Sequence, residues 1–232
     1  MINFILKFTT SLIYGILLKI KFLRSMSQEG EDLIIDRILK MKNIKYKDIF
    51  FLDIGSGHHI KYSNTFYYYI RGSKGICIDA FEQNIRLHKF LRPKDKCFNF
   101  LLGSKEKILD YYVFKQSELN TISKKKVDEL KGYKIFPLYL KQMKQSNTSQ
   151  FFSEKITDNV KKINLLNIDI EGAELDVLKS INWVNFKPEI ICVEIILRDF
   201  EDVYKNDIYK LLKLNGYNMY SKLINSVIFI KN

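Results

Sequence analysis

The sequence predicts an α/β domain with a doubly wound, mostly parallel sheet. Short, wholly apolar runs, such as residues 49–54, 75–79 and 163–170, alternate with segments of helical spacing. Strands that are apolar on both sides are typical of parallel sheets covered by helices on both faces. The chain has 232 residues, of which 47% are hydrophobic, and this is enough for one such domain with its own core.

Local signals set the order of the elements. A cap signal at Ser27 followed by apolar residues at helical spacing predicts a first helix, and Gly55, Pro93 and Gly216 predict where later elements stop. Helices are expected over residues 27–41, 63–70, 81–91, 174–181 and 202–214. Strands are expected over 49–54, 75–79, 97–102, 111–114, 163–170 and 189–196, with a terminal antiparallel pair over 217–220 and 226–230.

Two segments fall outside this alternation. The apolar and basic composition of residues 1–26 predicts an N-terminal helix. The longest uncharged run in it, residues 8–18, is too short to span a membrane. We expect this helix either to lie in a membrane interface or to pack on the main domain or on a second subunit of a homodimer. The remaining residues, 27–232, form the main domain, with an irregular, lysine-rich insertion at about 115–160 that is expected to bind the acceptor.

The composition limits the binding partners and the cellular location that we expect. The formal net charge is +12, but only six of the 38 basic residues are Arg and no basic stripe or known reader motif occurs, so no nucleic-acid partner is expected. The three cysteines lie in apolar runs without a CxxC pair, which predicts buried, reduced thiols and a cytoplasmic location, including the inner face of the membrane.

Carboxylates follow the strands where a doubly wound sheet binds its ligands, at the carboxyl ends. The first strand ends in Asp53, followed by a turn with Gly55 and Gly57. A dinucleotide fingerprint needs a third glycine where Ile60 stands, so the turn favours a ligand without a pyrophosphate. The second strand ends in Asp79, whose spacing favours hydrogen bonds to two ribose hydroxyls.

Asp169 and Glu171 end a later apolar strand, where a carboxylate is costly unless it is paired or hydrogen-bonded. They are candidates for contact with the cofactor, for a Mg²⁺ or Mn²⁺ site, and for the general base. The adjacent His58 and His59 follow the glycine turn and are further candidates for the base, with one of the two at most in that role. His88 is expected on a helix surface.

The blocks FLDIGSGHHIKYSNT, GICIDA, NTIS, LLNIDIEGAELDVLKSI and KPEIICVEI resemble, in this order, those of FkbM-type methyltransferases, from about Ser27 to Tyr220. The resemblance implies a seven-stranded class I methyltransferase (Rossmann-like) sheet with S-adenosylmethionine as the methyl donor. It implies cofactor contacts from Asp53, Gly55, Gly57, Asp79, Ala80 and Asp169. It also implies O-methylation of a sugar hydroxyl on a surface glycan or nucleotide-sugar precursor.

Several alternatives remain from the sequence. The acceptor could be a phosphorylated capsule modifier or a lipid. A nicotinamide oxidoreductase is opposed by the missing third glycine. A non-catalytic binding protein on the same fold is opposed by the intact set of strand-end acids and turn glycines.

Overall fold

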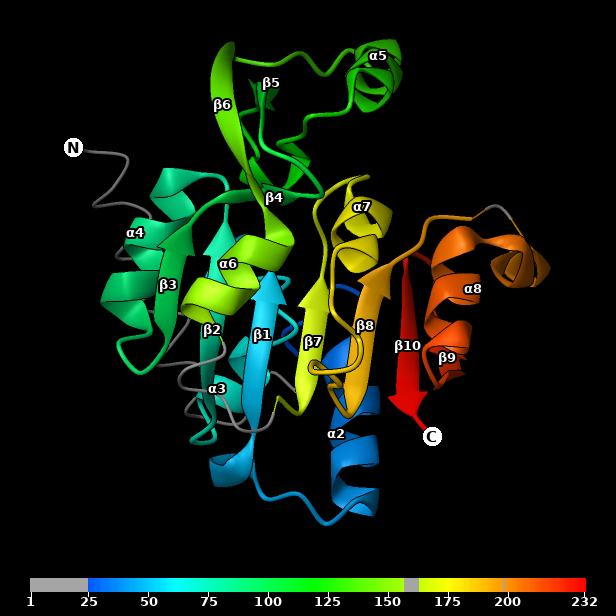
Figure 1. Ribbon diagram of the computed structural model, residues 1–232. Helices are drawn as coiled ribbons and strands as arrows, with labels where there is room; N and C mark the ends of the chain where they lie inside the picture. Colours follow the sequence, from blue (N-terminus) through cyan, green and yellow to red (C-terminus); the bar gives the residue numbers. More distant parts are fainter. Residues whose placement is uncertain (1–24, 157–162, 198) are drawn as a thin grey trace.

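The computed structural model describes residues 25–156, 163–197 and 199–232 (Figure 1). Its centre is a seven-stranded sheet in the order β3-β2-β1-β7-β8-β10-β9. The first five strands in this order are parallel, and β10 is antiparallel to both neighbours. The strands are β1 (Phe50–Ile54), β2 (Lys74–Asp79), β3 (Lys96–Asn99), β7 (Leu165–Ile168), β8 (Ile190–Glu194), β9 (Tyr217–Lys222) and β10 (Ser226–Lys231).

Helices cover both faces of this sheet, as a doubly wound fold requires. Leu52 and Ile54 of β1 face a core formed with α6 (Thr148–Lys155), α7 (Glu174–Lys179) and α8 (Asp207–Leu214). Phe51, one residue out of phase, faces a second core formed with α2 (Glu31–Met41), α3 (Phe66–Tyr69) and α4 (Glu82–Leu91). The alternation along β1 thus supplies apolar side chains to two cores, which explains its continuous apolar sequence.

A smaller sheet stands over the carboxyl edge of the main one (Figure 1). Its order is β4-β6-β5, from β4 (Leu101–Gly103), β5 (Lys107–Val113) and β6 (Tyr139–Asn147). The single-turn helix η2 (Ser117–Leu119) and α5 (Lys124–Gly132) lie between β5 and β6. Strand β6 was not predicted from the sequence. Most of its side chains are exposed or half-buried, and its Lys- and Gln-rich residues therefore show no clear alternation of apolar and polar side chains.

Several predicted boundaries were wrong. The strand expected over 97–102 is two strands in different sheets, because β3 pairs with β2 up to Asn99, whereas β4 starts at Leu101 and pairs with β6. The helix expected over 202–214 is a 3-10 helix, η3 (Phe200–Lys205), followed by α8. The break occurs at Asn206, whose side chain caps the Ile208 N–H at 2.8 Å. The helix expected over 63–70 is reduced to α3.

The first described helix also starts later than expected. Its cap position is Gly30, with φ 87°, instead of Ser27. The buried Asp32 accepts hydrogen bonds from the Ser27 hydroxyl and the Met26 N–H at 2.9 and 2.6 Å, which fixes the preceding segment in a non-helical path. A further single-turn helix, η1 (Tyr46–Asp48), leads into β1.

Two further predictions concern the N-terminal helix and the cysteine thiols. The expected N-terminal helix lies in residues outside the described part of the chain, apart from Ser25 and Met26. Among residues 25–156, 163–197 and 199–232, no helix has the length and apolar character to cross a bilayer. The three cysteines are buried and free, as predicted.

Candidate active site

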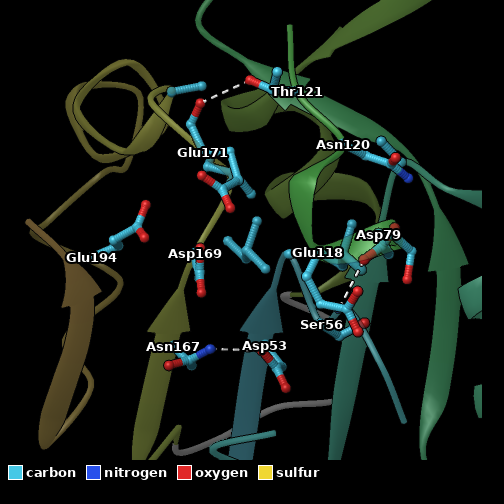
Figure 2. A pocket seen from close by; sticks show the side chains of 18 of the residues that line it. Asp53, Ser56, Asp79, Glu118, Asn120, Thr121, Asn167, Asp169, Glu171 and Glu194 are labelled. Carbon is cyan, nitrogen blue, oxygen red and sulfur yellow. Dashed lines mark hydrogen bonds between the residues drawn. The ribbon is translucent and has the colours of Figure 1, made fainter. Parts of the chain in front are cut away.

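A cavity of about 360 Å³ opens at the carboxyl edge of the main sheet, between β1, β2, β7 and β8 and the small sheet above them. Residues after each of the four strands line it, together with residues 117–122 and Lys126 of the insertion. The predicted site residues Asp53, Gly55, Gly57, His58, Asp79, Ala80, Asp169 and Glu171 all lie on its wall. Figure 2 shows Asp79, Asp53, Asp169 and Glu194 at or next to the ends of the neighbouring strands β2, β1, β7 and β8.

Gly55 makes the contact between the turn after β1 and the end of β7. Its φ is +80°, and a Cβ added there would lie 1.7 Å from the carbonyl oxygen of Asp169. A side chain at this position would therefore collide with backbone that has no room to move. Gly55 is required for the packing of the two strand ends, and only indirectly for the approach of a ligand.

Asp79 is tied to the same turn. Its Oδ2 accepts a hydrogen bond from the Gly57 N–H at 2.8 Å, and its Oδ1 accepts one from the Phe81 N–H at 2.6 Å. Burial raises the pKa of Asp79 to about 6, although these backbone N–H groups favour the charged form. Asn84 Nδ2 also donates to Oδ2, at 3.4 Å. A carboxylate has lone pairs for about four hydrogen bonds, so Asp79 keeps at least one acceptor site for a ligand in the cavity.

Two side chains hold the carboxylate of Asp53. Thr65 Oγ1 donates to one carboxylate oxygen at 2.5 Å, and Asn167 Nδ2 donates to the other at 2.9 Å (Figure 2). Burial raises its pKa, while the hydrogen bond from Thr65 and the buried Arg92 oppose that rise. Its exposed fraction is 1%, so its carboxylate mainly fixes the loop of Thr65 against β1 and β7.

Three carboxylates cluster at the ends of β7 and β8. One oxygen from each of Asp169, Glu174 and Glu194 lies within 4.8 Å of the other two. The Asp169 side chain is open to the cavity, but enclosure by protein and the adjacent Glu194 and Glu174 raise its pKa well above the usual value. Burial and Glu174 raise the pKa of Glu194 to about 7. This cluster can therefore hold a proton near neutral pH.

Glu171 does not join that cluster. Its backbone is left-handed, with φ 61°, and its carboxylate forms an ion pair with Lys126 of α5. Its carbonyl oxygen accepts a hydrogen bond from Thr121 Oγ1 at 3.2 Å (Figure 2). The expected pairing of Asp169 with Glu171 as ligands of one cation does not match this geometry, because Glu171 is turned toward the insertion.

Neither Glu174 nor Glu194 was a candidate site residue from the sequence. Glu174 does accept the N–H groups of Ile170 and Gly172, at 2.9 to 3.1 Å, but it also completes the acid cluster. The signal for Glu194 was present, because it ends an apolar strand in the same way as Asp169 does.

The three histidines divide between the wall and the core. His58 lines the cavity, and its Nδ1 accepts the N–H groups of Ile60 and Lys61 at 3.1 and 3.0 Å. The neutral ring then carries its proton on Nε2 and is a donor there instead of a base. His59 has an exposed fraction of 0% and is absent from the cavity wall. His88, expected on a surface, is also fully buried, under the glycine turn with Nε2 3.3 Å from the Gly57 carbonyl.

The insertion supplies cavity residues that the sequence did not single out. Asn120 receives the Phe114 N–H on Oδ1 at 2.8 Å, but its Nδ2 is buried and has no hydrogen-bond partner within the described structure. The Ser56 Oγ, on the opposite wall of the cavity, is also buried and has no hydrogen-bond partner within the described structure. Buried polar atoms normally have partners, so these two fit a polar ligand between the glycine turn and the insertion. Adenosine, with ring nitrogens and ribose hydroxyls, has the donors and acceptors for Ser56, Asp79 and Asn120.

The sheet order with a final antiparallel hairpin, and the cavity at the strand ends, are those of the class I S-adenosylmethionine-dependent methyltransferase fold. Residues 53–219 match the sequence family described as the methyltransferase FkbM domain. This match spans more than half of the chain, and the protein therefore belongs to the FkbM methyltransferase family.

Solved structures with a similar fold include three methyltransferases, each at low identity. A TehB-like SAM-dependent methyltransferase from Corynebacterium glutamicum aligns with 97% of this chain and 98% of its own, at 10% identity and a TM-score of 0.43. A precorrin-6y C5,15-methyltransferase from Geobacter metallireducens aligns over 90% and 93%, at 11% identity and 0.44. Methyltransferase FkbM from Methylobacillus flagellatus aligns over 88% and 56%, at 10% identity and 0.43. No curated protein sequence matches significantly.

Proposed function

We propose that this methyltransferase transfers a methyl group to a sugar hydroxyl of a surface glycan or nucleotide-sugar precursor, with Glu194 and Asp169 as the proton-accepting pair. The observation that carries the proposal is the acid cluster on the cavity wall, where the pKa of Glu194 is raised to about 7. An alcohol must lose its proton as it is methylated, and a base with a pKa near the working pH does this best.

The donor half of the cavity lies between the glycine turn and the insertion. S-adenosylmethionine, when bound, supplies a methyl group already activated on a sulfonium. Asp79 is placed to accept hydrogen bonds from the ribose hydroxyls, and the orphaned polar atoms of Ser56 and Asn120 are placed to bond the rest of the adenosyl group. Ala80 and Gly57 also line this half of the cavity, and their small size leaves room for the ligand.

The acceptor half lies toward β8. Asp169 and Glu194 share one region of the wall, so a hydroxyl bound there can pass its proton to the pair. Like charges so close are costly, and the second carboxylate favours uptake of a proton by the first. The bound hydroxyl must also be aligned with the methyl carbon, and such positioning contributes several kcal/mol, on the order of 7 or more in well-oriented systems.

The mouth of the cavity supports a carbohydrate acceptor. Gln28, Lys61 and Asn225 offer polar groups there, and Tyr62, half exposed, offers an aromatic face. Hydroxyl-rich rings are bound by such mixtures of amides and aromatic surface. In a phosphorylated capsule modifier or a phosphate-bearing lipid headgroup, the phosphate would pair with the charge of Lys61. Lys61→Ala should therefore weaken the binding of these acceptors more than the binding of a neutral sugar. We set the reaction in the cytoplasm, where buried thiols stay reduced.

The acid cluster also supports a second role, binding of Mg²⁺ or Mn²⁺, which are bound by carboxylate oxygens. The ligands would be Asp169, Glu174 and Glu194, whereas Glu171 is paired with Lys126. Calorimetric titration with each cation separates this role from the proton-accepting one. If activity survives a chelator and no heat of cation binding appears, the carboxylates act as the base alone.

The test of the proposed function has two arms. Purified protein is titrated with S-adenosylmethionine by calorimetry, and absence of binding by folded protein would contradict the donor assignment. Labelled donor is then incubated with glycan and nucleotide-sugar extracts, and the methylated product is identified by mass spectrometry. A methyl group found on protein, nucleic acid or a lipid chain instead of a sugar hydroxyl would overturn the acceptor assignment.

A further inference from the structure

The turn that joins α5 to β6 exposes an unusual number of large apolar side chains. Tyr133 is 80% exposed, Phe136 63%, Leu138 64% and Leu140 50%. We call these four residues, with Lys131 and Lys134, the tip surface. Single exposed apolar residues are common on proteins, but a contiguous group marks an interaction site.

The strand pairing explains why this group faces outward. In the β5–β6 ladder Tyr111 lies opposite Lys141 and Tyr112 opposite Leu140, and opposite residues share a face. Tyr111, with its neighbour Val113, packs against Phe81 on the inner face toward the main sheet. Leu140 therefore points away from the main sheet, and its face also carries Ile108, which is 71% exposed. Figure 1 shows this sheet and α5 at the far end of the molecule, beyond the carboxyl edge of the main sheet.

The insertion that carries the tip surface has a net positive charge. Residues 105–145 contain ten lysines and five acidic residues, which gives this segment a net charge of +5. Some of these charges are paired at the surface, such as Lys131 with Asp128 at 3.1 Å and Lys144 with Glu106 at 3.0 Å. Exposed aromatic and aliphatic side chains on a segment of net positive charge are complementary to an interface with apolar depth and negative headgroups.

We propose that the tip surface docks the protein on an anionic lipid membrane. Phe136, Leu138 and Leu140 enter the headgroup region, and the lysines contact lipid phosphates. The same insertion places Asn120, Thr121 and Lys126 on the wall of the active-site cavity, so docking holds the mouth of the cavity close to the bilayer. The proposal stands independently of the acceptor, since it requires no methyl transfer.

The test is co-sedimentation of the full chain with vesicles of phosphatidylcholine alone and of phosphatidylcholine with phosphatidylglycerol in equal parts. We expect binding to the anionic vesicles, weaker binding at high salt, and little binding to the neutral ones. The variant F136S/L138S/L140S should bind at least about tenfold more weakly, because it removes three apolar contacts. K131E/K134E should lose binding by a similar factor through charge.

Matched controls come from the far side of the molecule. V184S/L214S removes two side chains that are 84% and 85% exposed, and K47E/K74E reverses two exposed lysines before β1 and at the start of β2. Both controls should bind vesicles as the wild type does. All variants should keep their affinity for S-adenosylmethionine, which shows that they are folded.

Two results would overturn the proposal. One is undiminished vesicle binding by both tip variants, which would mean that another part of the chain is responsible. The other is absence of vesicle binding together with an oligomer of the wild type that the tip variants dissociate, which would assign the surface to a second copy of the chain.

Discussion

The backbone N–H of Gly57 donates a 2.8 Å hydrogen bond to the carboxylate of Asp79, which joins the turn after β1 to the end of β2. The two residues are separated by a helix and a connecting segment in the sequence, yet one bond sets the position of both. Asp79 also accepts the N–H of Phe81, so two backbone groups orient the carboxylate before any ligand arrives. Such preorganisation lowers the cost of ordering on binding.

Substitution of Asp79 by Ala should weaken binding of S-adenosylmethionine by about tenfold to a hundredfold. The expected loss is that of hydrogen bonds to a charged group, about 1.5–3 kcal/mol. Calorimetry measures the affinity, and Asp48→Ala, at an exposed position before β1, is the matched control. Wild-type affinity in a folded Asp79→Ala protein would refute the role in ribose binding.

The same affinity should depend on pH. Because burial raises the pKa of Asp79 to about 6, the ionised, accepting form is lost as the pH falls through that value. If only this form binds the ribose, affinity falls about tenfold for each pH unit below 6. Calorimetry between neutral and mildly acidic pH tests this, and Asp79→Ala should show a flat profile over the same range. A flat wild-type profile contradicts the prediction.

The parallel sheet and its strand-end acids could be predicted because apolar runs ending in Asp or Glu are local patterns. The acid cluster could not, because Glu174 and Glu194 come from different elements and only the β7–β8 pairing brings them together. The orientation of Glu171 depends on Lys126, in an insertion whose exposed strand has no clear hydrophobic period. Tertiary context, which no local pattern contains, decided each of these positions.

Gly55→Ala should destabilise the protein far more than Gly72→Ala. Both glycines have positive φ, +80° and +103°, but a Cβ on Gly55 meets the Asp169 carbonyl at 1.7 Å, whereas a Cβ on Gly72 meets nothing within 4 Å. We expect a loss of about 1–2 kcal/mol for Gly72→Ala from the backbone alone. Gly55→Ala should lose more than about 4 kcal/mol or fail to fold. Urea unfolding measures both, and equal losses would contradict the steric argument.

Arg92 should be essential for stability although it lies outside the cavity. It is fully buried, its Nε bonds to Asp95 at 2.7 Å, and its Nη2 bonds to Thr65, which in turn holds Asp53. Arg92→Met leaves the buried Asp95 without its cationic partner, which costs about 3–5 kcal/mol. Arg86→Met breaks the exposed pair with Glu82 and should cost less than about 1 kcal/mol. Similar losses in urea unfolding would show that the buried pair is not the cause.

The pH dependence of kcat should carry the signature of Glu194. Its pKa is raised to about 7, and the deprotonated form accepts the proton, so kcat should rise with pH through about 7 and then level off. Glu194→Gln should lower kcat by about 10²–10⁴-fold, whereas Glu201→Gln, at a nearby exposed position, should have little effect. Lys126 lowers the pKa of Glu194, so Lys126→Ala should move the rising limb to higher pH. If kcat rises at the same pH in Lys126→Ala as in the wild type, or if Glu194→Gln keeps full activity, another group accepts the proton.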